Sequence, residues 1–419
     1  MISIEYIRQN AEAAEEQLRS KGADVDIEHV LKLDEDQRAV LHEVEELRAK
    51  RNQLSSEMAK MDADEREKRL KEAEKLKRTL KEQEEHLAEV TAELEAILRK
   101  LPNPPAKDVP RGQDEGANVV VRTVGDIPQF SFEPKDYLAL AQQHDLIDIE
   151  RAAKVSGSRF GYIKNEAAVL EFALVRMALD ETAKENFMPI VPPVLVNEEA
   201  MRGIGYLDKE PEQVYHLVED NLYLVATAEH AIVPMFKDET LSEQELPKRF
   251  IGFSSAFRRE AGSYGKDTKG ILRVHQFDKV EMVTFCDAAT SAQEHERMLA
   301  IQERLMQALE IPYQVVHNAT GDMAFSAQNQ YDIESWIPSE GRYRETHSTS
   351  NTTDFQSRRL NIRRRGTDGT ELVHILNGTA FAIGRTLIAL LENHQRQDGS
   401  IAIPKALQPY AGFDVIASA

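Results

Sequence analysis

A long heptad pattern between Leu33 and Leu101 constrains the fold of this chain more than any other feature. Apolar residues recur there at the seven-residue spacing of a coiled-coil seam, with others at the three-four offset between them. Neither half of the pattern contains proline or glycine, so each half can form one uninterrupted helix. The seam residues are Leu33, Val40, Val44, Leu47, Leu54, Met58 and Met61 in the first half, and Ala73, Leu76, Leu80, Leu87, Val90, Leu94, Ile97 and Leu101 in the second.

A short break at residues 62–64 separates the two halves, and its aspartates are suited to cap a new helix. Two seamed helices of similar length that are joined by a short turn should fold back as an antiparallel hairpin. Each helix would run about 35 residues, or on the order of 50 Å, which is longer than a compact domain is wide. We therefore expect a projecting hairpin, which serves either to dimerise the chain or to bind a partner.

Basic residues gather in the second half of this hairpin, although the whole chain has a formal net charge of −20. Between Arg66 and Lys81 there are eight basic and three acidic residues. A basic stretch near the tip of a projecting rod suits a phosphate backbone, but the charge pattern fits a solvated helix face equally well. The candidate contacts to nucleic acid are Arg66, Lys68, Arg69, Lys71, Lys75 and Arg78.

Length, cysteine content and hydropathy limit the class of protein. A chain of 419 residues favours two or three domains. The single cysteine, Cys286, excludes an intrachain disulfide and a CxxC metal site, and it is expected in the core. We see no signal peptide and no apolar stretch near the roughly 20 residues that span a bilayer. A cytoplasmic protein without a membrane partner is therefore expected.

A proline-rich segment at 102–116 indicates a linker, and we place the domain boundary within it, with domains at 1–105 and 106–419. Beyond the linker, short runs of β-branched and aromatic residues alternate with helical patterns. The two commonest nucleotide-binding loops, GxGxxG and GxxxxGK[ST], are absent from the sequence. An α+β fold with mixed strand directions is the expectation.

The stretch from Phe250 to Met282 holds the clearest chemistry, and it reads FIGFSSAFRREAGSYGKDTKGILRVHQFDKVEM. Two strand-like runs, at 252–257 and 271–283, flank a loop rich in glycine and lysine, which is typical of loops that close over phosphates. Arg258 can bind a carboxylate or a phosphate with two parallel hydrogen bonds. Glu260 and Glu281 would suit an amino group, the exocyclic amine of a base, or a metal.

This string resembles motif 2 of the class II aminoacyl-tRNA synthetases, and in particular the motif of the seryl-tRNA synthetases. The FRxE signature lies at residues 257–260, and AGSYGKDTKG and RVHQFDKVE follow it. The resemblance covers nearly the whole chain. It includes a motif 1 at Arg176–Pro193, a motif 3 at Leu376–Asn393 with Arg385, a TxE serine loop at Thr227–Glu229, and the LRAKRN string at Leu47–Asn52 of the arm.

The resemblance implies a class II antiparallel sheet flanked by helices, preceded by a coiled-coil arm, in a homodimer. Residues 1–105 would be the tRNA-binding arm and residues 106–419 the catalytic domain. The implied reaction joins L-serine to ATP as seryl-adenylate and then transfers the seryl group to tRNA(Ser), and to tRNA(Sec) where that tRNA exists. Mg²⁺ would accompany ATP, and no structural zinc is expected.

The resemblance also implies roles for individual residues, with Arg258 and Arg385 as the catalytic pair. Glu345 and Ser348 would hold Mg²⁺ between the phosphates. The serine ligands would be Thr227, Glu229, Arg258, Glu281, Asn377 and Thr379. The ATP ligands would be Arg258, Arg259, Glu260, Val274, Phe277, Glu345, Thr346, His347, Ser348 and Arg385.

One segment departs from the family pattern. The family commonly reads REISSCSN where residues 344–351 read RETHSTSN, so Thr346 and His347 should alter the detail of the ATP pocket. Two alternative functions make different predictions for this sequence. A paralogue that loads a carrier protein would lack the long arm, and a non-enzymatic RNA-binding relative would lack Arg258 or Arg385.

Overall fold

The computed structural model describes residues 1–262, 269–366 and 369–418. Contacts within the chain divide it into two compact units, Ile2–Pro102 and Asn103–Ala419. The helices of the first unit are α1 (Ile4–Gln9), α2 (Ala11–Ser20), α3 (Ile27–Met58) and α4 (Ala63–Arg99).

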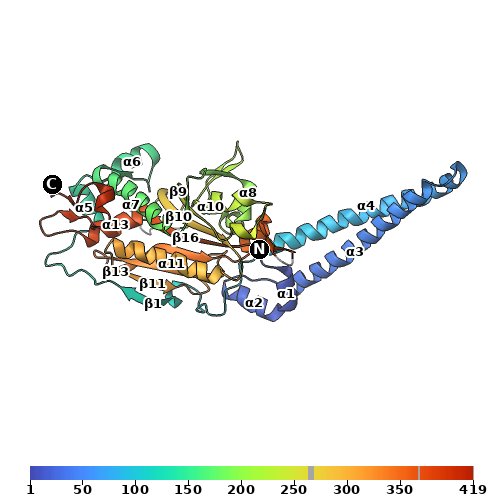
Figure 1. The fold of residues 1–419 in the computed structure, drawn as a ribbon, viewed down its shortest axis with the longest axis horizontal. Helices are drawn as coiled ribbons and strands as arrows, with labels where there is room; N and C mark the ends of the chain where they lie inside the picture. The colour runs from blue at the N-terminus through green and yellow to red at the C-terminus, as the bar shows by residue number, and fades with distance from the viewer. Residues whose placement is uncertain (263–268, 367–368, 419) are drawn as a thin grey trace. The chain divides into compact units, whose positions relative to one another are not determined.

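Helices α3 and α4 form the predicted antiparallel hairpin, and Figure 1 shows them as a long pair joined by a short turn. The helices contain 32 and 37 residues, close to the expected length. Asp62 caps α4 by accepting a hydrogen bond from the backbone N–H of Glu65 at 2.9 Å. Val44 and Leu80 are buried together in the seam. The seam predicted the hairpin correctly, although it also included Met61 and Leu101, which lie just beyond the helix ends.

The second unit is built on one large sheet, which is antiparallel except for the parallel pair formed by its last two strands. This is the antiparallel sheet with helices that the sequence resemblance implies. In spatial order the strands are β1 (Val119–Val124), β11 (Tyr313–His317), β12 (Asn329–Ile337), β13 (Arg342–Asn351), β16 (His374–Ala382), β10 (Gln276–Cys286), β9 (Lys248–Phe257) and β4 (Met188–Ile190).

Helices and short strands complete this unit, and Figure 1 shows α11 lying along the large sheet. The α-helices are α5 (Tyr137–Gln143), α6 (Ile149–Ser156), α7 (Asn165–Ala183), α8 (Glu198–Gly203), α9 (Tyr206–Lys209), α10 (Glu229–Ile232), α11 (Ser291–Ala308), α12 (Phe355–Leu360), α13 (Ile383–Asn393) and α14 (Gln408–Ala411). The short strands are β2 (Ile147–Asp148), β3 (Tyr162–Ile163), β5 (Leu195–Asn197), β6 (His216–Leu217), β7 (Leu222–Leu224), β8 (Thr240–Leu241), β14 (Arg363–Gly366), β15 (Gly369–Leu372), β17 (Ile401–Ala402) and β18 (Val415–Ile416). Single 3₁₀ turns lie at Glu115–Ala117, Pro211–Gln213, Val233–Phe236 and Glu243–Glu245.

Strand β10 separates two hydrophobic clusters, because successive side chains of a strand point to opposite faces. Val280 and Met282 belong to the larger cluster, and Cys286 is buried there as expected. Val283 and Phe285 belong to the smaller cluster on the opposite face. The same alternation places residues 279 and 281 on the face of Val283 and Phe285.

The proline-rich segment is more firmly attached than a linker. The side-chain amide of Asn103 donates to the backbone carbonyls of Ser326 and Thr352 at 3.0 and 2.8 Å. Val109 is buried beside Met323 and Ala327. Proline content indicated irregular backbone correctly, but long-range packing, which composition does not encode, ties that backbone to the catalytic unit.

The second strand-like run begins later than expected, since β10 starts at Gln276 rather than near residue 271. Ile271 donates its backbone N–H to the hydroxyl of Tyr137 at 3.0 Å, instead of to a neighbouring strand. Residues 263–268 of the glycine- and lysine-rich loop lie outside the described part of the structure. In the described residues, no helix combines the length and the apolar character that a membrane crossing requires.

Candidate active site

Two adjoining cavities lie over strands β10, β13 and β16. The larger one, of about 290 Å³, is lined by four glutamates and is called the acidic cavity here. The smaller one, of about 110 Å³, is lined by Arg258, Arg273 and Arg385 and is called the arginine cavity. Five residues line both and form a shared wall: Arg258, Lys279, Glu345, Ser348 and Thr379.

All six residues predicted to bind serine line the acidic cavity. Strand register explains part of this convergence, because Glu281 pairs with Thr379 of β16 and Val283 pairs with Asn377. Thr227 and Glu229 enter from the turn that leads into α10. The segments that contain Glu229 and Asn377 are more than 140 residues apart in the chain but meet in this cavity. The side-chain amide of Asn377 donates a hydrogen bond to the Glu229 carboxylate at 3.1 Å.

The carboxylate of Glu229 is held in place by two side-chain amides and can bind a cation in the acidic cavity. Its carboxylate accepts hydrogen bonds from the side-chain amides of Gln356 at 2.6 Å and Asn377 at 3.1 Å. Burial in the cavity wall raises the pKa of Glu229 to about 7, because desolvation disfavours the charged form. An arriving ammonium group would favour the ionised carboxylate.

Glu281 has a different partner, a lysine that the sequence analysis did not single out. The Nζ atom of Lys279 lies 2.6 Å from Oε2 of Glu281, and both side chains are largely buried. Burial raises the pKa of Glu281, while Lys279 and the hydroxyl of Thr379 oppose that rise. The carboxylate is therefore held next to Thr379 as an acceptor for a hydroxyl group in the acidic cavity.

Arg258 lies where the two cavities meet. Its backbone N–H donates to the carbonyl of His275 at 3.0 Å, and its guanidinium lies 5.4 Å from the centre of the Phe277 ring. Its buried Nε atom has no hydrogen-bond partner in residues 1–262, 269–366 and 369–418, so it can donate to a ligand. Glu260, which was predicted to read the adenine amine, is ion-paired with Arg273 at 2.7 Å.

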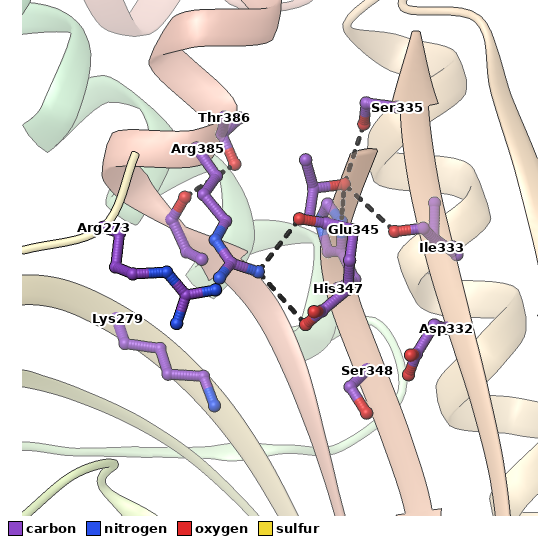
Figure 2. A network of polar contacts seen from close by, with 12 residues as sticks. Arg273, Lys279, Asp332, Ile333, Ser335, Glu345, His347, Ser348, Arg385 and Thr386 are labelled. Atoms are coloured by element: carbon purple, nitrogen blue, oxygen red, sulfur yellow. Dashed lines mark hydrogen bonds and ion pairs between the residues drawn. The ribbon is translucent and has the colours of Figure 1, made fainter. Parts of the chain in front are cut away.

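Arg385 and Glu345 also line the arginine cavity, and Figure 2 shows the contact between them. The Nη1 atom of Arg385 lies 3.1 Å from the Glu345 carboxylate and donates to the Glu345 carbonyl at 3.0 Å. Desolvation of Glu345 by itself would raise its pKa. The guanidinium groups of Arg385 and Arg258 outweigh this effect, so the pKa of Glu345 is lowered. Glu345 is thus an ionised carboxylate beside Ser348.

Asp332 is a further carboxylate that the sequence analysis missed, and it lies beside Ser348 on the neighbouring strand in Figure 2. It accepts hydrogen bonds from the side-chain amides of Asn318 at 2.7 Å and Gln330 at 3.1 Å. Burial raises the pKa of Asp332 to about 7. Asp332 lies opposite Ser348 because of the register between β12 and β13. No local sequence pattern predicts this register.

The unusual pair Thr346 and His347 forms a buried hydrogen-bond network. The hydroxyl of Thr346 lies 2.7 Å from that of Ser335 and 2.9 Å from Nδ1 of His347. Burial lowers the pKa of His347 to about 4, so the ring is neutral near pH 7. Thr346 lines the arginine cavity, whereas the described lining residues of both cavities do not include His347 or Arg259. Arg259 lies 5.9 Å from the Tyr215 ring instead.

The remaining predicted ATP residues, Val274 and Phe277, line the arginine cavity with Arg258, Glu260, Glu345, Ser348 and Arg385. In the other unit, the predicted tRNA contacts are exposed on α4. Arg69 forms an ion pair with Glu72 at 2.5 Å, and Arg78 approaches Glu82 at 3.9 Å. Between Arg66 and Lys81 the helix still carries eight basic residues against three acidic ones.

Comparisons with known proteins agree with this arrangement. Residues 1–105 match the seryl-tRNA synthetase N-terminal domain, and residues 214–394 match the tRNA synthetase class II core domain (G, H, P, S and T). The serine–tRNA ligase of Rubrobacter xylanophilus is 43% identical over 422 residues and covers 100% of both chains. That of Acidothermus cellulolyticus is 51% identical over 309 residues, which is 74% of this chain and 73% of the relative.

Solved structures show the same likeness. The seryl-tRNA synthetase from Pyrococcus horikoshii, crystallised with ATP, is 38% identical, covers 100% of both chains and superposes with a TM-score of 0.93. The cytoplasmic serine–tRNA ligase of Naegleria fowleri in complex with AMP is 30% identical, covers 99% of this chain and 97% of its own, and has a TM-score of 0.87. Full-length identity, both domain matches and the shared fold lead to one conclusion: the chain belongs to the seryl-tRNA synthetase family of class II aminoacyl-tRNA synthetases.

Proposed function

We propose that this protein is a serine–tRNA ligase, which activates L-serine with ATP and transfers the seryl group to tRNA(Ser). The observation that carries this proposal is the shared wall between the two cavities. One cavity offers carboxylates and hydroxyls to an amino acid, and the other offers arginines and an aromatic ring to a nucleotide. Serine and ATP bound in these cavities would meet at Arg258.

Serine fits the acidic cavity through complementary groups. Glu229, with Thr227 nearby, would bind the ammonium group, and Asn377 would orient the Glu229 carboxylate. Glu281 and Thr379 would bind the side-chain hydroxyl. Alanine would leave these buried polar groups unpaired, which can reduce its use by about 10⁴-fold.

ATP would bind over the arginine cavity, which is too small to enclose the whole nucleotide, with its base beside Phe277 and Val274 and its γ-phosphate near Arg385. Glu260 would give up its ion pair with Arg273 and accept a hydrogen bond from the adenine amine. Arg259 and Thr346 would contact ATP at the edge of its binding site. Because the described cavity lining excludes His347, its contact with ATP would come through its backbone.

The residues present also fit Mg²⁺, because an ionised Glu345 and the Ser348 hydroxyl are the hard oxygen donors that this ion prefers. When bound with ATP, the ion would neutralise charge on the phosphates. Arg385, now paired with Glu345, would exchange that contact for a phosphate oxygen.

The chemistry requires positioning more than acid–base catalysis. A serine carboxylate oxygen attacks the α-phosphorus of ATP, the bond to the bridging oxygen breaks, and pyrophosphate leaves. Arg258 holds both the carboxylate and the α-phosphate, so that the reacting atoms stay aligned. The terminal ribose hydroxyl of tRNA then attacks the carbonyl of seryl-adenylate and releases AMP.

The domain at 1–105 would be the tRNA-binding arm, and that at 106–419 the catalytic domain. Arg66, Lys68, Arg69, Lys71, Lys75 and Arg78 are exposed along α4 and would contact the tRNA backbone. tRNA(Sec) would be a second substrate where it exists. A ligase that supplies translation would act in the cytoplasm.

A homodimer is also part of the proposal. Four large apolar side chains lie exposed on α7, on β4 and just after β4, within or beside the motif 1 segment. Scattered exposed apolar residues are common, but a group of this size indicates an interface. The residues and their exposed fractions are Val169 at 44%, Phe172 at 67%, Met188 at 57% and Val191 at 81%.

The proposed function is tested by ATP–pyrophosphate exchange and aminoacylation with purified components. Serine should support exchange, and alanine and threonine should support it far less. Charge reversal of Lys68, Lys71 and Lys75 to glutamate should weaken tRNA charging and leave serine-dependent exchange unchanged. Exchange that does not depend on serine would refute the activity, and unchanged charging would refute the role of the arm.

The carrier-protein alternative is not favoured. The full-length relatives are serine–tRNA ligases, and the N-terminal domain match spans the complete arm. Arg258 and Arg385 are both present and line the arginine cavity, which also speaks against a non-enzymatic relative.

A further inference from the structure

The shared wall contains two cations, and the proposed function assigns a role to Arg258 alone. Lys279 lines both cavities as well. Its side chain is 11% exposed, and it shares a face of β10 with Glu281. A largely buried ammonium group at the junction of two cavities calls for an explanation, because burying a charge is costly unless it interacts with other groups.

The contacts of Lys279 leave it able to bind a substrate. Its Nζ atom is ion-paired with Glu281 at 2.6 Å and donates to the hydroxyl of Thr227 at 3.4 Å. Since an ammonium group has three N–H donors, at least one donor remains for a ligand. Figure 2 shows the side chain extending below Arg273 and Arg385, toward Ser348.

We propose that Lys279 is a second catalytic cation of the adenylation step, which contacts the serine carboxylate and an α-phosphoryl oxygen as they join. This inference rests on the proposed function. A carboxylate oxygen forms a bond to the α-phosphorus, the bond from phosphorus to the α–β bridging oxygen breaks, and pyrophosphate leaves with the electron pair. Lys279 stays protonated throughout. A fixed cation at this position stabilises the crowded negative charge of the transition state more than that of the separate substrates.

The competing explanation is that Lys279 acts only through Glu281, by neutralising that carboxylate. The two explanations predict different kinetics. A lysine that only supports Glu281 would matter for binding serine and for rejecting alanine. A lysine that contacts the reacting atoms would matter mainly for the rate of adenylation, with a smaller effect on the binding of either substrate.

The first experiment compares Lys279→Met with the wild type in serine-dependent ATP–pyrophosphate exchange. We expect kcat to fall by about 10²- to 10³-fold, as for the loss of other electrostatic groups at a reacting centre, while the KM for serine changes less. Arg249→Met is the matched control. Arg249 is also 11% exposed and pairs with the buried Glu294 at 2.6 Å, but it lines neither cavity in the described part of the chain. Its loss should reduce stability without a comparable fall in kcat.

A double-mutant cycle with Glu281→Gln separates the two roles. The double variant Lys279→Met/Glu281→Gln carries no unpaired carboxylate, which also protects the test against a folding defect of the single variant. We expect the double variant to be much slower than Glu281→Gln alone. A double variant as active as Glu281→Gln would overturn the proposal, because Lys279 would then act through Glu281 only.

Calorimetry gives a second readout that does not depend on turnover. The non-reactive analogue seryl-sulfamoyl-adenosine would span the junction, so Lys279→Met should weaken its binding more than that of serine or ATP alone. Equal losses for the analogue and for serine would contradict the proposal. A wild-type protein without serine-dependent exchange would instead refute the proposed function itself, and this outcome differs from failure of the Lys279 variants.

Discussion

At the scale of single residues, the site depends on carboxylates in different electrostatic environments. Glu345 faces two arginines, which lower its pKa, whereas burial raises that of Glu229 to about 7. The first carboxylate is therefore ionised before substrate binds, and the second becomes fully ionised when a cation arrives.

Serine binding should consequently depend on pH. With the pKa of Glu229 at about 7, only about one tenth of the carboxylate is ionised at pH 6, so serine should bind roughly tenfold more weakly there than at pH 8. Titration calorimetry at the two pH values measures this ratio. Glu229→Gln should bind weakly at both, and the exposed control Glu243→Gln should behave as the wild type. A wild-type affinity that is independent of pH would contradict this role of Glu229.

The same pKa affects stability. The folded-state pKa of Glu229 lies above its ordinary value of 4.5, so between about pH 4.5 and pH 7 the folded protein holds a proton that the unfolded chain releases. The contribution of Glu229 to stability is thus lost as pH rises through this window. Glu229→Gln should gain stability relative to the wild type between pH 5 and pH 8, as measured by urea denaturation. A constant difference would be inconsistent with the raised pKa.

The hydroxyl of Thr346 belongs to a buried network with Ser335 and His347. Thr346→Val keeps the shape of the side chain but leaves both partners without this contact. We expect the free energy of unfolding to fall by about 1–3 kcal/mol, the usual cost of an unsatisfied buried polar group. Chemical denaturation measures the change. Thr240→Val, at an exposed position, is the control, and an equal effect of the two would argue against the network.

At the scale of elements, Tyr137 at the start of α5 anchors the end of the motif 2 loop. Its hydroxyl accepts from the backbone N–H of Ile271 at 3.0 Å and donates to the carbonyl of Lys269 at 3.3 Å. Gly270 between them has a φ of +79°, and a Cβ atom there would lie 1.6 Å from the Tyr137 hydroxyl oxygen. This close approach requires glycine and fixes the backbone that leads into Val274.

Tyr137→Phe should therefore raise the KM for ATP more than that for serine. Ile271 and Val274 line the arginine cavity, and neither is among the described residues of the acidic cavity. The loss of one hydrogen bond at this anchor should change the KM for ATP about 2- to 10-fold. Tyr6→Phe, which removes a hydroxyl bonded to Gln17 in the other unit, should leave both KM values unchanged. Equal changes in the two KM values would indicate a general structural defect.

At the scale of the whole molecule, the exposed apolar residues of the motif 1 region predict an assembly. Phe172→Asp should weaken a homodimer, because it places a charge in an apolar interface. Sedimentation velocity across a range of concentrations measures the monomer fraction. Val218→Asp is the matched control, since Val218 is 75% exposed but lies outside the motif 1 region. A wild-type protein that is monomeric at all concentrations would refute the assembly.

The sequence by itself determined the features that depend on local periodicity. Heptad spacing predicted the hairpin of α3 and α4, and the strand-like runs at 252–257 and 271–283 indicated β9 and β10. The resemblance to the class II motifs named six candidate serine ligands, which all line one cavity. The helices and strands follow from short-range patterns, because helix and strand geometry repeat every few residues, whereas the candidate ligands rest on the motif strings.

Only the tertiary structure decided which of these groups meet and how each is charged. Lys279 stands in the sequence two residues before Glu281, yet its role depends on the shared wall of two cavities. Asp332 reaches Ser348 through strand register, and Glu229 owes its raised pKa to burial. Burial and register arise from contacts between distant segments, and the energy of a charge depends on those surroundings rather than on its sequence neighbours.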